Sequence, residues 1–308
     1  MISEFAIDPE VMARWGHFQT LWGDFGIAQR RQVGLYPKDW KRTVMDRARE
    51  LARDKVNSEM QVTKMEACLS GALSKPKFRK ANCEDWSDSR SWLENAIPHE
   101  PSFPAIVSGI AHQDERLVTI NDLLRDEPPY FRSPEVEVTR TVEAIVGMLW
   151  PLLAQSREVI LVDPNFDPRE PRFLGLVEAI IDRLHDLGRT PSRFEIHTSK
   201  YREQSGQKSV RIQEHHYRDR LGATLYGGWK VKVCCWAESQ AQDHQHPRFV
   251  LTEIGGIHLD WGLDAGAAGT STIAKGLGDR MHANCYSRYS SVGHPFGADP
   301  DNDLIEID

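Results

Sequence analysis

The sequence lacks an apolar segment of the roughly 20 residues that a helix needs to cross a bilayer. Its longest apolar stretch, 145–154, is too short and contains Pro151. The first ten residues carry three acidic side chains and no basic one, which is unlike the basic-then-apolar pattern of a secretory signal. We therefore expect no membrane span and a cytoplasmic location.

Cysteine is also scarce, with five residues in a chain of 308, and no two cysteines form a Cys-x-x-Cys pair. The odd number and the missing pairs argue against a disulfide framework and against a structural zinc site. His244, His246 and His258 are the nearest approach to a metal cluster, but no carboxylate or cysteine completes the set. The sequence predicts neither a metal nor a cofactor.

The chain has no excess of positive charge, because its formal net charge is −7. An acidic protein is not steered to nucleic acid by its overall field, so such a partner requires a local basic surface. Residues 193–232 offer one, with nine Lys or Arg against four Asp or Glu. This stretch is either a solvated face or a track for a nucleic-acid backbone.

Prolines mark the clearest division of the chain, at Pro128, Pro129 and Pro134. Such a cluster is typical of a linker between domains. The sequence predicts a mainly helical N-terminal domain of unknown role over residues 1–132, with helices within Asp8–Lys55 and one strand at Ala105–Ile110. A second domain is expected over residues 133–308.

The second domain alternates between helical and strand patterns, which predicts an α/β fold. Helices are expected over Glu135–Leu153 and Pro171–Leu187, and a polar helix or loop over Gln207–Arg220. The expected strands are Glu158–Val162, Arg193–His197, Trp229–Trp236 and a hairpin of Phe249–Thr252 with Gly256–Leu259. Residues 262–278 are rich in Gly, Ala and Ser and predict an ordered loop, and the acidic residues 299–308 predict a solvated tail.

One segment carries residues suited to phosphoryl chemistry: His246-Pro-Arg248-Phe-Val-Leu-Thr-Glu253, followed by Gly262-Leu-Asp264. On a strand, His246 and Arg248 project from the same face because they are two residues apart. A histidine nitrogen can attack phosphorus or act as a general acid, and a guanidinium can stabilise the phosphate oxygens. Glu253 can orient the imidazole, although alternation places it on the opposite face of a continuous strand.

This spacing resembles the signature of the phospholipase D superfamily, which places His, Lys and Asp at the same intervals and then a glycine-containing strand. The segment is also similar to smaller members, including the C-terminal domain of MIT proteins and bacterial defence-associated proteins. The resemblance covers about residues 140–308. It implies a mixed sheet sandwiched by helices and a metal-independent phosphodiesterase or nuclease, with His246 as nucleophile and Arg248 and Glu253 beside it.

The chain departs from the family pattern in four ways. Arg248 replaces Lys, Glu253 replaces Asp, and Gly262-Leu-Asp264 stands in place of Gly-Ser-x-Asn. A second motif is also missing, because His216 and Arg218 are followed by Ala223 where a carboxylate is needed. Two functions stay open: a nuclease with a homodimeric site, and a catalytically degenerate module that binds a phosphate ligand or a protein within a larger bacterial complex.

Several further residues are candidates for the same site. If the basic stretch follows a phosphate backbone, the cations predicted to bind it are Arg218, Lys230 and Lys232. Asp163 and Asp167 follow an expected strand, where sites in open α/β sheets gather, and together with Asp264 they can orient the histidine. Asp163 and Asp167 are equally typical of a turn, since they stand in Asp-Pro-Asn-Phe-Asp-Pro.

Overall fold

A computed structural model describes residues 3–71, 77–120, 135–204, 207–237, 248–290 and 302–308, without the side chains of 201–211. The chain divides into two compact units, residues 2–134 and 135–308. No helix of the described residues is both long and apolar enough to cross a membrane.

The N-terminal unit is built on a sheet of five parallel strands in the order β3-β2-β1-β4-β5. The strands are β1 (Ser3–Ile7), β2 (Arg31–Leu35), β3 (Phe78–Lys80), β4 (Ile106–Ser108) and β5 (Leu117–Thr119). The expectation of a mainly helical domain missed this sheet except for β4, which lies within the expected strand Ala105–Ile110. Strands of three to five residues are too short for a visible hydrophobic period, and tertiary packing decides their conformation.

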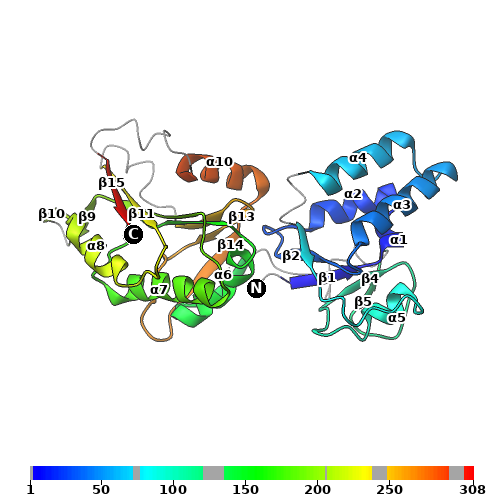
Figure 1. Ribbon diagram of the computed structural model, residues 1–308, viewed down its shortest axis with the longest axis horizontal. Helices are drawn as coiled ribbons and strands as arrows, with labels where there is room; N and C mark the ends of the chain where they lie inside the picture. The colour runs from blue at the N-terminus through cyan, green and yellow to red at the C-terminus, as the bar shows by residue number, and fades with distance from the viewer. Residues whose placement is uncertain (1–2, 72–76, 121–134, 205–206, 238–247, 291–301) are drawn as a thin grey trace. The chain divides into compact units, whose positions relative to one another are not determined.

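Five helices of this unit cover the two faces of its sheet: α1 (Pro9–Met12), α2 (Trp15–Asp24), α3 (Trp40–Arg53), α4 (Glu59–Ser70) and α5 (Trp92–Ala96). Phe5 and Ile7 point into the core formed with α1 to α4, whereas Ala6 between them points into a smaller cluster with α5. Figure 1 shows α2, α3 and α4 on one side of these strands and α5 on the other. Because successive side chains of a strand point to opposite faces, the two faces of β1 contribute to two different hydrophobic cores.

The C-terminal unit contains an eight-stranded mixed sheet in the order β15-β11-β8-β7-β12-β13-β14-β6. Strands β7, β8 and β11 are parallel, and the other neighbouring pairs are antiparallel. The strands are β6 (Glu135–Thr139), β7 (Glu158–Val162), β8 (Arg193–Ser199), β11 (Val231–Trp236), β12 (Phe249–Thr252), β13 (Gly255–Leu259), β14 (Ser271–Gly276) and β15 (Asp303–Ile307). Strands β9 (Tyr201–Gln204) and β10 (Gln207–Arg211) form a separate antiparallel pair.

Helices lie on both sides of this sheet, with α6 (Val142–Leu153), α7 (Pro171–Asp186) and α8 (Glu214–Gly222) on one side and α10 (Asp279–Ser290) on the other (Figure 1). Thr141 caps α6 by accepting a hydrogen bond from the Ala144 amide, and Pro171 opens α7 with a backbone angle suited to a first turn. The predicted α/β class is confirmed. The phospholipase-D-like arrangement stays a prediction.

Four segments of this unit differ from expectation. The expected polar helix or loop Gln207–Arg220 begins with strand β10, and its helix α8 starts only at Glu214. The expected helix Glu135–Leu153 begins only at Val142, because Glu135–Thr139 alternates polar and apolar residues and forms β6 beside β14. The expected loop 262–278 contains β14, which lies between β13 and β6. The expected acidic tail contains β15, whose Ile305 and Ile307 are buried against the sheet.

Candidate functional site

A pocket of about 390 Å³ opens where the loop after β13 meets the end of β7 and the start of α7. We call it the Asp264 pocket. It combines two carboxylates, two guanidinium groups, an amide and two aromatic rings, from Arg140, Asp163, Asn165, Arg172, Phe173, Trp261 and Asp264. Two of the sequence-predicted residues, Asp163 and Asp264, therefore share one pocket.

Three hydrogen bonds to separate elements fix the loop Gly262–Gly266. The Leu263 amide donates to the Asp163 carboxylate (2.7 Å), which closes the loop onto the end of β7. The amides of Ala265 and Gly266 donate to the carbonyls of Arg172 (3.0 Å) and Arg140 (2.8 Å). The loop is thus held by the end of β7, the first turn of α7 and the residue before the α6 cap. This arrangement places Asp264 between two arginines.

Asp264 receives both guanidinium groups of the pocket. Arg140 Nη2 lies 2.6 Å from one carboxylate oxygen, and Arg172 Nη1 lies 3.2 Å from the other. The side chain of Asp264 is 4% exposed and that of Arg140 12%, whereas half of the Arg172 side chain is open to solvent. Asp264 therefore orients two cations, one enclosed and one that a ligand can reach.

Asp163 and Arg248 meet beside Gly262. A Cβ atom at Gly262 would lie 3.1 Å from the Asp163 carboxylate and 3.5 Å from Arg248 Nε, and 2.8 Å from Asp264. Burial raises the pKa of Asp163, while the amides of Leu263 and Asn165 and the charge of Arg248 act in the opposite direction. Asp163 therefore keeps a proton to a higher pH than an ordinary aspartate.

Trp261 forms one wall of the pocket and is 66% exposed. The Arg140 guanidinium carbon lies 5.9 Å from its ring centre, and Arg172 lies 4.8 Å from the ring of Phe173. Both pocket arginines thus lie against aromatic faces, an arrangement that favours a fixed guanidinium plane.

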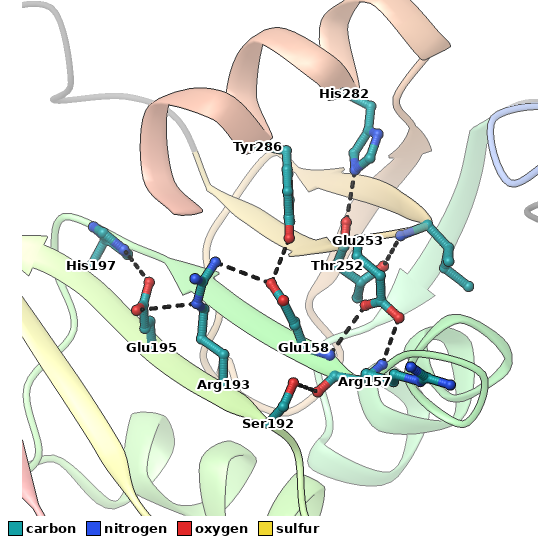
Figure 2. Close-up of polar contacts among 11 residues, drawn as sticks. Arg157, Glu158, Ser192, Arg193, Glu195, His197, Thr252, Glu253, His282 and Tyr286 are labelled. Atoms are coloured by element: carbon teal, nitrogen blue, oxygen red, sulfur yellow. Dashed lines mark hydrogen bonds and ion pairs between the residues drawn. The ribbon is translucent and has the colours of Figure 1, made fainter. Parts of the chain in front are cut away.

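The structure separates Glu253 from Arg248. They stand just after and just before β12, so an extended chain puts about 16 Å between them. The Glu253 carboxylate accepts hydrogen bonds from the Arg157 (2.7 Å) and Glu158 (3.1 Å) amides at the start of β7, as Figure 2 shows. In this position Glu253 holds strand ends together. His246 lies outside the described residues.

The other predicted residues lie outside the Asp264 pocket. Arg218 donates to the Glu306 carbonyl (2.6 Å) and pairs with Glu214 on its own helix. Lys232 pairs with Glu306 (3.1 Å), and Lys230 is exposed just before β11. Asp167 is buried, and its carboxylate forms an ion pair with the Arg169 guanidinium (2.9 Å). The same carboxylate accepts a hydrogen bond from the Arg169 backbone amide, as expected for a residue in a turn.

Comparison with known proteins gives no family for this chain: no family model matches it, and no curated protein matches it. A solved structure of TrmBL2, an archaeal chromatin protein whose structure shows a novel mode of DNA binding, aligns over 54% of this chain and 55% of its own, at 14% identity. The chain thus spans about half the length of that protein. Its TM-score of 0.29 is too low to carry an argument about fold or function.

Sequence reasoning missed Arg140, Arg172 and Trp261, the residues that give the pocket its charge and its exposed wall. The three are distant in sequence and meet only because β6 pairs with β14 and α7 returns to the same edge. A local signal existed for Arg172 alone, because it stands in the first turn of the expected helix Pro171–Leu187. Cations there oppose the helix dipole and contribute nothing to helix stability.

A buried polar cluster beneath α10 was also missed (Figure 2). His197 accepts a hydrogen bond from the Trp236 indole (3.0 Å). Its other ring nitrogen lies 3.6 Å from the Glu195 carboxylate, the contact drawn in Figure 2. Burial lowers the pKa of His197, although Glu195 acts in the opposite direction. Glu158 accepts from Arg193 (3.1 Å) and from Tyr286 of α10. These contacts attach α10 to β7 and β8.

Proposed function

We propose that the C-terminal unit binds a phosphate ester in the Asp264 pocket. The observation that carries this proposal is the convergence of Arg140 and Arg172 on one buried carboxylate, Asp264, with Arg248 beside Asp163. Arg140 and Arg172 line the pocket opposite Asp163 and Asp264, Arg248 lies beside Asp163, and Glu170 lies 3.9 Å from Arg172. The half of the Arg172 side chain that is open to solvent therefore favours an anion.

The orientation of the helices supports the same ligand. Arg140 precedes the cap of α6 and Arg172 lies in the first turn of α7, so the positive ends of two helix dipoles border the pocket. If the ion pairs with Asp264 served only to hold the loop Gly262–Gly266, the two arginines would not both need to lie at helix N-termini. The exposed half of Arg172 retains donors for the oxygen atoms of a ligand.

Hydrolysis of the bound ester is the second part of this proposal. Arg248 borders Asp163, and His246 precedes Arg248 by two residues in the sequence. In a phospholipase-D-like site one histidine attacks phosphorus, and the leaving oxygen takes a proton from the histidine of the second motif. Water then gives a proton back to that second histidine and releases the phosphoryl group from the first. Since the chain has one such motif, a second copy of the chain must supply the other histidine.

Binding is tested with Arg172→Gln, which removes the accessible charge and keeps a polar side chain. We expect titration calorimetry with a chromogenic phosphodiester to show affinity about 10- to 100-fold weaker, which corresponds to the loss of one charged hydrogen bond. Arg183→Gln is the control, because Arg183 lies near the opposite end of α7 against Trp150. Equal affinities in the wild type and Arg172→Gln would contradict the proposed site.

Hydrolysis is tested by incubating the wild type and His246→Ala with DNA, RNA and the chromogenic diester, with and without EDTA. We expect turnover by the wild type alone, unchanged by EDTA, and a dimer by light scattering. Binding without turnover in both proteins would assign the unit to the catalytically degenerate class. Loss of turnover in EDTA would contradict the histidine mechanism.

A further inference from the structure

Trp261 is exposed to an extent that no other tryptophan in the chain matches. All nine tryptophans lie in described parts of the chain, and the other eight are buried or half-buried. Trp261 is 66% exposed although it follows a strand of the central sheet and its amide is tied to the Thr272 hydroxyl (3.3 Å). An indole held by a fixed backbone and open to solvent is a surface for a planar ligand.

A second pocket of about 370 Å³ lies on the β6 and β14 side of Trp261. We call it the β6 pocket. Trp261 is the residue that it shares with the Asp264 pocket. Its other walls are acidic, hydroxylic and apolar, from Glu135, Val136, Glu137, Ser271, Thr272 and Ile273. The two pockets are therefore adjacent and contrast in charge.

The β6 pocket repels phosphate and suits a ligand with hydrogen-bond donors. Glu135 pairs with Lys275 (2.6 Å), and Glu137 accepts from the Ser271 hydroxyl, so both carboxylates are held in place. A carboxylate accepts several hydrogen bonds, which leaves capacity for a base amino group or a sugar hydroxyl. Ile273, which is 43% exposed, adds an apolar surface next to Trp261.

We propose that the ligand is an unpaired nucleotide, with its phosphate in the Asp264 pocket and its base stacked on Trp261 toward the β6 pocket. This inference rests on the proposed phosphate site and adds the identity of the group attached to the phosphate. The contrast in charge determines the orientation of the bound ligand. The arginines of the Asp264 pocket attract its phosphate, whereas the glutamates of the β6 pocket repel it. The base is unpaired because a duplex hides the base faces that a protruding indole needs.

Three probes separate the contributions of base, sugar and phosphate: adenosine 5′-monophosphate, ribose 5-phosphate and inorganic phosphate. We expect Trp261→Ala to weaken binding of the nucleotide about 5- to 150-fold, the range for one base stacked on an aromatic ring. The same variant weakens binding of the two base-free probes much less, because these probes lose only the indole wall beside Arg140. Trp261→Phe keeps a ring and recovers most of the nucleotide affinity. Met281→Ala is the control for an exposed apolar side chain, because Met281 is 56% exposed on α10.

Two comparisons distinguish stacking of a base on Trp261 from binding of phosphate in the Asp264 pocket. If Trp261→Ala weakens all three probes equally or none, the stacking inference is overturned, while Arg172→Gln still reports on phosphate. A Trp261→Ala variant that changes oligomeric state without changing nucleotide affinity would assign the indole to a protein interface instead. A single-stranded oligonucleotide is expected to bind more tightly than the same sequence as a duplex, and the reverse order would also overturn the inference.

Discussion

Gly262 lies where both the backbone conformation and the nearby carboxylates disfavour any residue with a Cβ atom. Its φ is +128°, and a Cβ would lie 2.8 Å from Asp264 and 3.1 Å from Asp163. We expect Gly262→Ala to displace both carboxylates and to abolish most phosphate-ester binding. It should also lower the free energy of unfolding by about 1–3 kcal/mol, because the substituted residue adopts a strained backbone conformation.

Gly269→Ala provides the matched comparison for this prediction. Gly269 also has a positive φ (+80°), but a Cβ there would contact nothing within 4 Å. Its substitution should lower stability by about 1–2 kcal/mol and leave ligand affinity unchanged. Calorimetric titration and urea unfolding of both variants measure the two effects. Unchanged ligand affinity in Gly262→Ala would show that the carboxylate positions are unimportant for binding.

Asp8 gives the N-terminal unit a pH-dependent stability. Burial at the end of β1 raises the pKa of Asp8 to about 6, although a hydrogen bond from the Glu10 amide lowers it. The folded state therefore binds more protons than the unfolded state between about pH 4 and pH 6. Stability falls as the pH rises through this window, since the buried carboxyl must ionise.

We expect Asp8→Asn to flatten this dependence while keeping the cap on α1, because the amide oxygen still accepts from Glu10. Thermal unfolding measured from pH 4 to pH 7 should show a smaller decline in the variant than in the wild type. Glu4, whose pKa burial raises to about 6, leaves a residual slope. The exposed Asp54 supplies the control Asp54→Asn. Parallel curves for Asp8→Asn and wild type would contradict the assignment.

Among the elements, β15 completes one edge of the C-terminal sheet. It pairs antiparallel with β11 over five residues, and Ile305 and Ile307 are 3% and 4% exposed. We expect Ile305→Ala to lower the free energy of unfolding by about 2–4 kcal/mol, because the cavity left behind adds to the lost burial. Leu304→Ala should change it by less than about 0.5 kcal/mol, since Leu304 is 54% exposed.

Urea unfolding measured for these two variants tests whether β15 is part of the sheet in solution. Similar, small effects of Ile305→Ala and Leu304→Ala would mean that this segment does not pair with β11. The free edge of β11 would then be open to association with other chains, which sedimentation of the wild type detects.

Long periodic segments were predictable from sequence, and short edge strands were not. The amphipathic helix α7 and the buried strand β7 carry enough apolar residues in register to define their conformation. Strand β6 was predicted as the start of a helix because Val138 continues the apolar spacing of Val142 and Ile145. Strand β15 was predicted as part of a tail because residues 299–308 carry five acidic side chains and no basic one. Their conformation depends on partners that are remote in sequence, β14 and β11.

The same limit applies to the candidate site. Asp163 and Asp264 were predictable because each follows an expected strand or motif, and the structure brings them to one pocket. Arg140 and Trp261 were not predictable, because they line the pocket only once β6 lies beside β14. Glu253 was predicted from motif spacing alone, and its contacts with the start of β7 could not be read from a strand pattern.

At the scale of the whole molecule, each unit has its own sheet and its own buried clusters. A unit with a separate core is expected to fold without the other. We therefore expect residues 135–308, produced alone, to give the circular dichroism of a folded α/β protein and a cooperative thermal transition. The fragment contains all residues of the Asp264 pocket, so it should bind the phosphodiester probe with the affinity of the full chain. A folded fragment that binds more weakly would require the N-terminal unit to contribute to the site, whereas an unfolded one would contradict the independence of the two cores.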